Sequence, residues 1–140
     1  EKLRVSTTGT DADWVVKLID VYPADEPNNT YMPNKNITLS NYQQMVRSEV
    51  MPARFRNSFE KPEAMLPNQE TAVNVQLQDV LHTFKKGHRI MVQIQSTWFP
   101  LIQRNPQTFV PNIYKANESD FQKQTHKVFN NSSIEFSVLK

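Results

Sequence analysis

The sequence predicts an all-β domain of the sandwich or jelly-roll class, and three observations support this prediction. Apolar residues recur with a spacing of two instead of the helical value of about 3.6. In residues 88–96, for example, Ile90, Val92 and Ile94 share one face, which we expect to face the core. The apolar runs are short, and clusters of proline and asparagine separate them. The 140 residues, of which 38% are hydrophobic, suit one domain with one core.

The predicted strands follow one another along the chain. Residues 14–21 are apolar on both faces, which is typical of a central strand covered from both sides. Met51 and Pro52 are expected to interrupt the next region and divide it into two strands. The predicted strands span residues 3–7, 14–21, 44–47, 53–58, 72–77, 88–96, 126–129 and 134–139.

The segments between these strands are predicted to be turns and loops. Residues 23–41 are rich in proline and asparagine and lack periodicity, so we expect a long loop there. Residues 95–115 begin as a strand and continue as a second long loop. Short helical turns are expected at residues 79–84 and 118–122.

The composition narrows the class of protein. The net charge is +2 and no cluster of lysine and arginine occurs, which argues against a nucleic-acid-binding protein. No apolar run approaches the roughly 18 residues of a membrane helix, so no membrane partner is predicted. The absence of cysteine excludes disulfides and thiolate metal sites. The two glycines, Gly9 and Gly87, are each expected in a turn with positive φ.

No catalytic or metal-binding set emerges from the sequence. The G-x-S-x-G elbow of serine hydrolases is absent. The spacing of His82, His88 and His126 fits no zinc motif, so each histidine is expected to make a hydrogen bond near a turn. Asp11 and Asp13 are expected to accept backbone N–H groups in a turn and not to bind calcium. We therefore predict no catalytic residue, no cofactor and no metal in this chain.

Two adjacent aromatic residues, Trp98 and Phe99, follow the strand predicted at residues 88–96. Neighbouring side chains of a strand point to opposite faces, so one can fill the core while the other faces outward. An outward tryptophan serves as a sugar-stacking platform, as an interface anchor or as a lid on the core. Periodicity leaves these three alternatives open.

Four segments resemble, in the same order, a known family. They are STTGTDADWVVKLIDVYP (6–23), ARFRNSFEKPE (53–63), HTFKKGHRIMVQIQSTWFPLIQRNP (82–106) and SSIEFSVL (132–139). Together they are similar to the C-terminal domain of the α/β-hydrolase group that includes cocaine esterase, glutaryl 7-aminocephalosporanic acid acylase and X-Pro dipeptidyl-peptidase. The proline- and asparagine-rich loop and the run RNSFEKPE place the acylase branch nearest.

The resemblance implies a jelly-roll β-sandwich of the galactose-binding-domain-like type, spanning residues 1–140 as a single domain. It also implies a catalytic α/β-hydrolase domain in the same chain, which holds the Ser, Asp and His of the triad. The family domain begins further upstream than Glu1, so the first strand or strands are expected to be missing. Residues 3–7 are then the expected exposed edge, and self-association as a symmetric dimer is expected. A periplasmic or secreted parent is favoured over a cytoplasmic one.

Two functions follow from these observations. The first is a non-catalytic domain that packs on and supports the catalytic domain of a serine hydrolase of the acylase, esterase or X-Pro dipeptidyl-peptidase type. Its expected interface residues are Trp98, Phe99, Arg104 and Asn105. The alternative is an independent carbohydrate-binding module, in which Trp98, Gln103 and Asn105 form the sugar platform.

Overall fold

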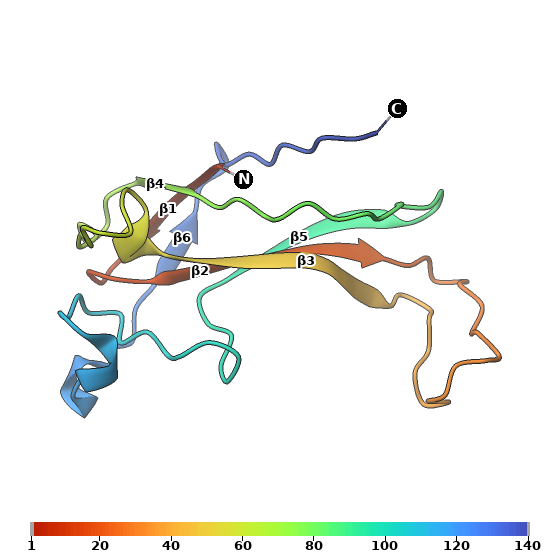
Figure 1. The fold of residues 1–140 in the computed structure, drawn as a ribbon, viewed down its shortest axis with the longest axis horizontal. Helices are drawn as coiled ribbons and strands as arrows, with labels where there is room; N and C mark the ends of the chain where they lie inside the picture. Colours follow the sequence, from red (N-terminus) through yellow and green to blue (C-terminus); the bar gives the residue numbers. More distant parts are fainter. Residues whose placement is uncertain (1, 140) are drawn as a thin grey trace.

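The computed structural model describes residues 2–139, which are built almost entirely of β-strands and loops. Six strands form two antiparallel three-stranded sheets (Figure 1). This architecture confirms the predicted all-β sandwich class. The strands are β1 (Lys2–Thr7), β2 (Asp13–Val21), β3 (Gln43–Pro52), β4 (Thr71–Asn74), β5 (Arg89–Gln95) and β6 (His126–Val128), and the short 3-10 turns are η1 (Ala53–Phe55), η2 (Ile113–Lys115) and η3 (Glu118–Asp120).

The order of strands places one long strand at the centre of each sheet. Sheet A has the order β4-β1-β6, and sheet B has the order β3-β2-β5. Almost every residue of β2 is buried, which confirms the prediction of a central strand covered on both faces. The prediction that residues 3–7 form an exposed edge is wrong, because β1 pairs with β4 on one side and β6 on the other.

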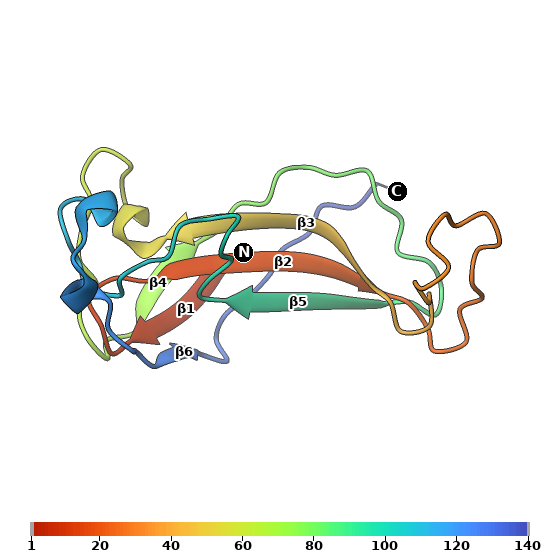
Figure 2. The same cartoon turned by 90° about the horizontal axis from the view of Figure 1, so that it is seen from below.

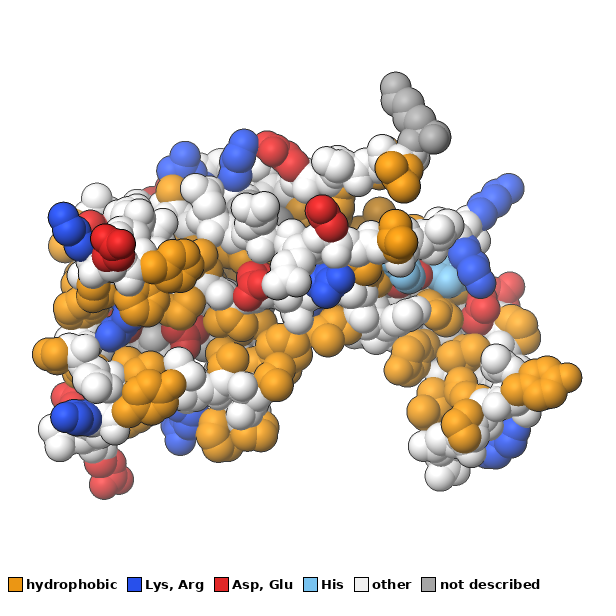
Figure 3. Space-filling view, viewed as in Figure 1, with side chains coloured by type: hydrophobic (Ala, Val, Ile, Leu, Met, Phe, Trp, Pro, Cys, Tyr) orange, Lys and Arg blue, Asp and Glu red, His pale blue; other side chains and the backbone are white. Residues whose placement is uncertain are grey.

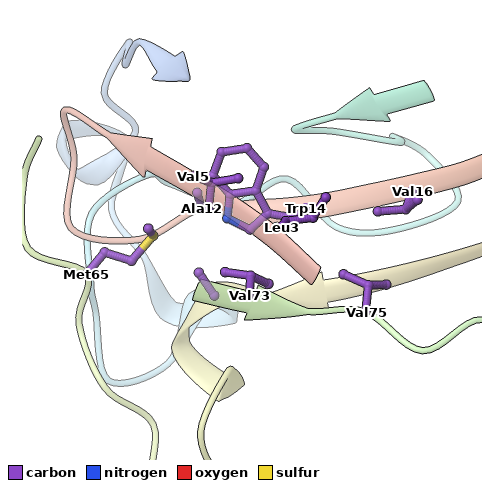
Figure 4. Close-up of a cluster of buried hydrophobic side chains, with 9 residues drawn as sticks. Leu3, Val5, Ala12, Trp14, Val16, Met65, Val73 and Val75 are labelled. Carbon is purple, nitrogen blue, oxygen red and sulfur yellow. The ribbon is translucent and has the colours of Figure 1, made fainter. Parts of the chain in front are cut away.

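The core lies between sheet A and one half of sheet B. Trp14 and Val16 of β2 face Leu3 of β1 and Val73 of β4 (Figure 4), and each of these side chains is 3% exposed or less. Full burial of such a side chain contributes roughly 1.5–3 kcal/mol. The complete cluster is Leu3, Val5, Ala12, Trp14, Val16, Ala53, Met65, Val73 and Val75.

The core thins along β5. Ile94 and Val92 pack partly against the buried cluster, as predicted. Ile90 is 54% exposed, so the prediction that it is buried in the core is wrong. The reason is that sheet B is longer than sheet A. The strands β2 and β3 have nine and ten residues, whereas β4 and β6 have four and three, and no paired strand of sheet A covers the Ile90 end.

Two further strand predictions are wrong. Residues 44–47 and 53–58 do not form two strands, because β3 runs unbroken to Pro52 and the chain then enters η1. Pro52 is tolerated because β3 is an edge strand and its outer side needs no N–H donor. Residues 134–139 form no strand within the described part of the chain, although they follow the isolated bridge between Lys2 and Ser133.

The long loops leave sheet B at opposite ends (Figures 1 and 2). The loop at residues 22–42 extends beyond one end, and residues 96–125 fold beneath the other end, on the face away from sheet A. The helical turn predicted at residues 118–122 is present as η3. The turn predicted at 79–84 is absent, and that segment is extended chain.

The two glycines have different roles. Gly87 has a φ of 92°, as expected for a turn glycine. Gly9 does not have positive φ, so that prediction is wrong. A Cβ at Gly9 would lie 2.3 Å from the backbone oxygen of Gln107, which means that the absence of a side chain allows two loops to touch.

Candidate domain-interface surface

Trp98 covers the outer face of sheet B, opposite sheet A. It is half-buried, and the Nζ atom of Lys17 lies 4.0 Å from the centroid of its ring. Lys17 belongs to β2, between the buried residues Val16 and Leu18. A cation at this distance from an indole is attracted by its π face. The Trp98 ring and the Lys17 side chain therefore contact each other on the outer face of sheet B, beside β2.

The residues that follow Trp98 present apolar side chains to solvent. Phe99 is 64% exposed and Leu101 is 68% exposed. Phe99, Arg104 and Phe121 belong to the lining of a shallow cavity of about 700 Å³. The guanidinium carbon of Arg104 lies 5.7 Å from the ring centroid of Phe121. Hydrophobic side chains gather on this underside of the molecule (Figure 3), which we call the loop surface and define as Phe99, Leu101, Arg104 and Phe121.

Asn105 is buried and anchors the loop instead of facing solvent. Its Nδ2 donates to Oδ1 of Asp13 at 2.9 Å, and its Oδ1 accepts from the backbone N of Gln107 at 2.7 Å. Burial raises the pKa of Asp13 to about 6; the hydrogen bond from Asn105 and the charge of Arg54 oppose this rise, and the charge of Asp11 adds to it. Asp13 thus accepts a side-chain amide and not the backbone N–H predicted for it. The loop that carries Arg104 is held by this contact.

A buried ion pair between Asp11 and Arg54 fixes the same end of the sandwich. Nε and Nη2 of Arg54 donate to Oδ2 of Asp11 at 2.8 and 2.6 Å, and Nη1 donates to the backbone oxygen of Val110 at 2.9 Å. The Asp11 side chain is fully buried, and that of Arg54 is 7% exposed. Oδ1 of Asp11 accepts the backbone N of Ala12, as predicted for Asp11. The pair therefore links the turn before β2, η1 and the second long loop.

The histidines make local contacts. Nε2 of His82 and Nδ1 of His88 lie 2.9 and 2.8 Å from the two carboxylate oxygens of Asp20, which confirms the hydrogen bonds expected for these two. His126 packs edge-on against Trp14, and burial lowers its pKa. Its Nδ1 atom has no hydrogen-bond partner among residues 2–139, so the prediction holds only for the first two.

Neither a metal-binding cluster nor a membrane-spanning helix is found among residues 2–139. Within residues 2–139, no three histidine, aspartate or glutamate side chains come together as a metal site. None of the helical elements in that range has the length and apolar character needed to cross a membrane.

Sequence reasoning missed the contact between Lys17 and Trp98 and two members of the loop surface, Leu101 and Phe121. Lys17 could not be linked to Trp98 without the pairing of β2 and β5, which places their outer faces together. Phe121 comes from a segment that shares no periodicity with the loop. Leu101 had a signal, since it is an apolar residue that directly follows a proline in a loop.

Comparison with known proteins identifies the family. Residues 2–133 match the X-Pro dipeptidyl-peptidase C-terminal non-catalytic domain. The chain belongs to this family. It is also 28% identical over 107 residues to the cocaine esterase of Rhodococcus sp. (strain MB1 Bresler), an alignment that covers 76% of this chain and 16% of the esterase.

Two solved structures are similar to this family member over more than nine-tenths of its length. An aminopeptidase from the marine sediment archaeon Thaumarchaeota archaeon superposes with a TM-score of 0.82 and 46% identity, covering 91% of this chain. An alpha-amino acid ester hydrolase superposes with a TM-score of 0.83 and 44% identity, covering 92%. The chain spans 20% of each of those proteins. The resemblance found in the four sequence segments is thereby confirmed, and the chain is a non-catalytic C-terminal domain of this hydrolase group.

Proposed function

We propose that residues 1–140 are a single domain of a longer serine hydrolase, and that this domain packs on and supports the catalytic α/β-hydrolase domain. The similar proteins of known structure are an aminopeptidase and an ester hydrolase, and this chain spans a fifth of each. They support a parent enzyme that cleaves amide or ester bonds. The domain contributes stability and one wall beside the active site.

The observation that carries the proposal is the loop surface. Phe99 and Leu101 are more than half exposed, although two hydrogen bonds, one from Asn105 to Asp13 and one from Arg54 to Val110, hold the surrounding loop in place. Because these hydrogen bonds fix the loop, it does not rearrange to bury the two apolar side chains against the rest of the domain. Such side chains are typical anchors of a protein interface, because burying them in a partner removes apolar surface from water. Trp98 and Asn105 support the surface from beneath, and Arg104 supplies its charged rim.

The carbohydrate-binding alternative finds less support. A sugar platform needs a free aromatic face with polar side chains beside it. Lys17 occupies one face of the Trp98 ring, and the amide of Asn105 is engaged by Asp13. Trp98, Gln103 and Asn105 therefore do not offer a shared binding face.

The test uses the natural longer chain that contains these residues. The double variant Phe99→Ser/Leu101→Ser is expected to lower the melting temperature and the rate of p-nitrophenyl ester or aminoacyl anilide hydrolysis. In the 140-residue chain the same change is expected to leave the urea midpoint unchanged, because both side chains are already exposed. Tyr31→Ser is the matched control, since Tyr31 is 92% exposed in the distant loop at residues 22–42. If the double variant changed the melting temperature and hydrolysis rate of the longer chain no more than Tyr31→Ser does, the proposal would be overturned.

A further inference from the structure

Asp20 of β2 is a buried carboxylate that joins separate segments at the end of sheet B where Ile90 lies. It is 1% exposed and pairs with Ile90 across β2 and β5. Its Oδ2 lies 2.9 Å from Nε2 of His82, and its Oδ1 lies 2.8 Å from Nδ1 of His88. His82 belongs to the extended segment after β4, and His88 belongs to the turn before β5. Because a carboxylate accepts and does not donate, these contacts fix which nitrogen of each ring carries the first proton.

His88 lies between two carboxylates. Its side chain is 4% exposed, and its second ring nitrogen, Nε2, lies 3.9 Å from Oε2 of Glu26 in the loop at residues 22–42. This distance is too long for a hydrogen bond, because a nitrogen donor lies about 2.7–3.2 Å from its oxygen acceptor. In Figures 1 and 2 the loop and the turn before β5 lie at the same end of the molecule. We call the approach of Nε2 of His88 to Oε2 of Glu26 the latch contact.

The protonation state of His88 determines whether the latch contact becomes a hydrogen bond. A neutral imidazole has one N–H, and in His88 it is the Nδ1–H that donates to Asp20. Nε2 then carries a lone pair and faces the carboxylate of Glu26, so two acceptors meet and no hydrogen bond forms. An imidazolium has an N–H on both nitrogens and donates to both carboxylates at once. The second bond is charge-assisted, which favours an N–O distance well below 3.9 Å.

The latch contact is the polar connection between residues 24–40 and the rest of the domain. Within the described residues, the other hydrogen bonds of this segment all join residues of the loop at 22–42 to one another. The carbonyl of Pro23, for example, accepts from the N–H of Glu26 at 3.3 Å and from that of Asn41 at 3.2 Å. Glu26 therefore lies where the two arms of the loop meet, so a bond at this residue restrains both arms.

Tyr22 packs beside the same imidazole and adds no charge to it. Its ring centroid lies 4.6 Å from that of His88, and its OH donates to Oε1 of Gln44 on β3. Burial raises the pKa of Tyr22, and the negative charges of Asp20 and Glu26 raise it further. Tyr22 therefore stays neutral wherever histidine titrates. The two carboxylates that act on Tyr22 are the same two that flank His88.

The remaining charged groups around His88 leave Glu26 to the latch contact. Within residues 2–139, Glu26 forms no ion pair with any cation on the elements that surround His88. His82 bonds to Asp20 through Nε2 and is 19% exposed, so a proton on its other nitrogen changes no contact of the loop. The cations are Arg47 of β3, which donates to the backbone oxygen of Asp79, and the exposed residues Lys85, Lys86 and Arg89.

We propose that protonation of His88 fastens the loop at residues 22–42 to the turn before β5, through an ion pair between His88 and Glu26. The pair closes as the pH falls through the range in which histidines titrate, from about pH 8 to about pH 5, and it opens as the pH rises. Asp20 is a positioning residue, because its bond to Nδ1 holds the ring with Nε2 toward Glu26. This pH-sensitive device goes beyond the proposed function and requires neither a catalytic domain nor the loop surface.

Amide hydrogen exchange of the natural longer chain, followed by mass spectrometry at about pH 5 and about pH 8, tests the proposal. Labelling times are scaled to the chemical exchange rate at each pH, so that only protection by the structure is compared. Peptides that cover residues 24–41 are expected to be protected about fivefold more at the lower pH, as one partly exposed ion pair allows. Equal protection of these peptides at the two pH values overturns the proposal.

A matched pair of variants assigns the effect to the latch contact. Glu26→Gln puts an amide there, which donates to a neutral imidazole and accepts from a charged one, so the difference in protection between the two pH values is expected to disappear. Asp25→Asn removes the same charge from the neighbouring exposed residue, which forms no ion pair within residues 2–139, and is expected to keep the fivefold difference. Asp13, whose pKa is raised to about 6, titrates in all of these chains and does not distinguish them.

Two results from the variants contradict the proposal. If Glu26→Gln kept the pH dependence seen in Asp25→Asn, the group that fastens the loop would not be Glu26. If Glu26→Gln lowered the protection equally at both pH values, Glu26 would hold the loop whether or not His88 is protonated. The variants of Phe99 and Leu101 test a different surface, so this proposal and the proposed function fail independently.

Discussion

The two ends of the sandwich are built differently. At the closed end, around Trp14, both sheets overlap and apolar side chains are almost fully buried. At the open end, around Ile90, sheet B continues without a paired strand above it, and large apolar side chains remain exposed. The extent of the shorter sheet, and not the hydrophobicity of the longer one, therefore sets the limit of the core.

Ion pairs follow the same division. At the closed end, Asp11 and Arg54 are shielded from water and joined by two hydrogen bonds. At the open end, Lys2 and Glu135 lie 2.7 Å apart, but their side chains are 64% and 72% exposed. The same type of contact therefore has different consequences at the two ends. Water screens the exposed pair, so losing one of its members costs little. In the buried pair each charge needs the other, because no water replaces a lost partner.

The largest effect is expected from breaking the buried pair. Arg54→Ala leaves the buried carboxylate of Asp11 without its partner and is expected to destabilise the domain by about 3–5 kcal/mol. Lys2→Ala removes one member of the exposed pair and is expected to leave the free energy of unfolding unchanged. Urea denaturation of both variants checks the contrast. Similar midpoints for the two would show that the ends do not differ in this respect.

The pH dependence of stability sharpens the comparison further. The pKa of Asp13 is raised from 3.8 to about 6 in the folded domain, so the folded state binds a proton that the unfolded state releases. The contribution of this group is therefore greatest below pH 4, falls as the pH rises to about 6, and is constant above that value. The fall amounts to about 3 kcal/mol, at about 1.4 kcal/mol for each unit of pKa difference.

The variant Asp13→Asn isolates this contribution, because it cannot ionise and its amide oxygen still accepts from Asn105. Between pH 4 and pH 6.5 the original chain loses the contribution of Asp13 and the variant does not. The free energy of unfolding of Asp13→Asn, minus that of the original chain, is therefore expected to rise over this range. Ser48→Ala, on β3 and away from the buried network, is the control whose difference stays constant. If the free energies of unfolding of Asp13→Asn and of the original chain differed by the same amount at every pH, the group that titrates would not be Asp13.

The closed end was largely predictable from the sequence. The apolar patterns of β1, β2 and β5 identify these strands within one or two residues. The residues of β5 alternate with a period of two, whereas β2 is apolar on both faces. At the other end, beside Ile90, the contacts of His82 and His88 were also predicted as hydrogen bonds, although their shared acceptor, Asp20, was not. Long-range pairings of this kind depend on register, which one sequence does not reveal.

The open end explains two of the wrong predictions, those for residues 134–139 and for Ile90. Residues 134–139 alternate as a strand should, but the described chain provides no backbone for them to pair with. Ile90 carries the same periodic signal as Val92, and only the length of sheet A distinguishes them. The loop surface was predictable in part, because Trp98 and Phe99 stand out, whereas the anchoring of Asn105 to Asp13 required the fold.

The smallest effects are expected at the two glycines, one at each end. Gly9→Ala at the closed end places a Cβ 2.3 Å from the backbone oxygen of Gln107, and such overpacking costs about 1–3 kcal/mol. Gly87→Ala at the open end meets no atom within 4 Å, so its cost comes from the positive φ alone and is about 1 kcal/mol.

Asparagine distinguishes the two causes, because it tolerates the left-handed region better than alanine but needs more room. Gly87→Asn is therefore expected to be more stable than Gly87→Ala, whereas Gly9→Asn is expected to be no more stable than Gly9→Ala. Urea midpoints of the four variants measure both differences. If asparagine improved on alanine at Gly9 as well, the constraint there would lie in the backbone conformation and not in the contact with Gln107.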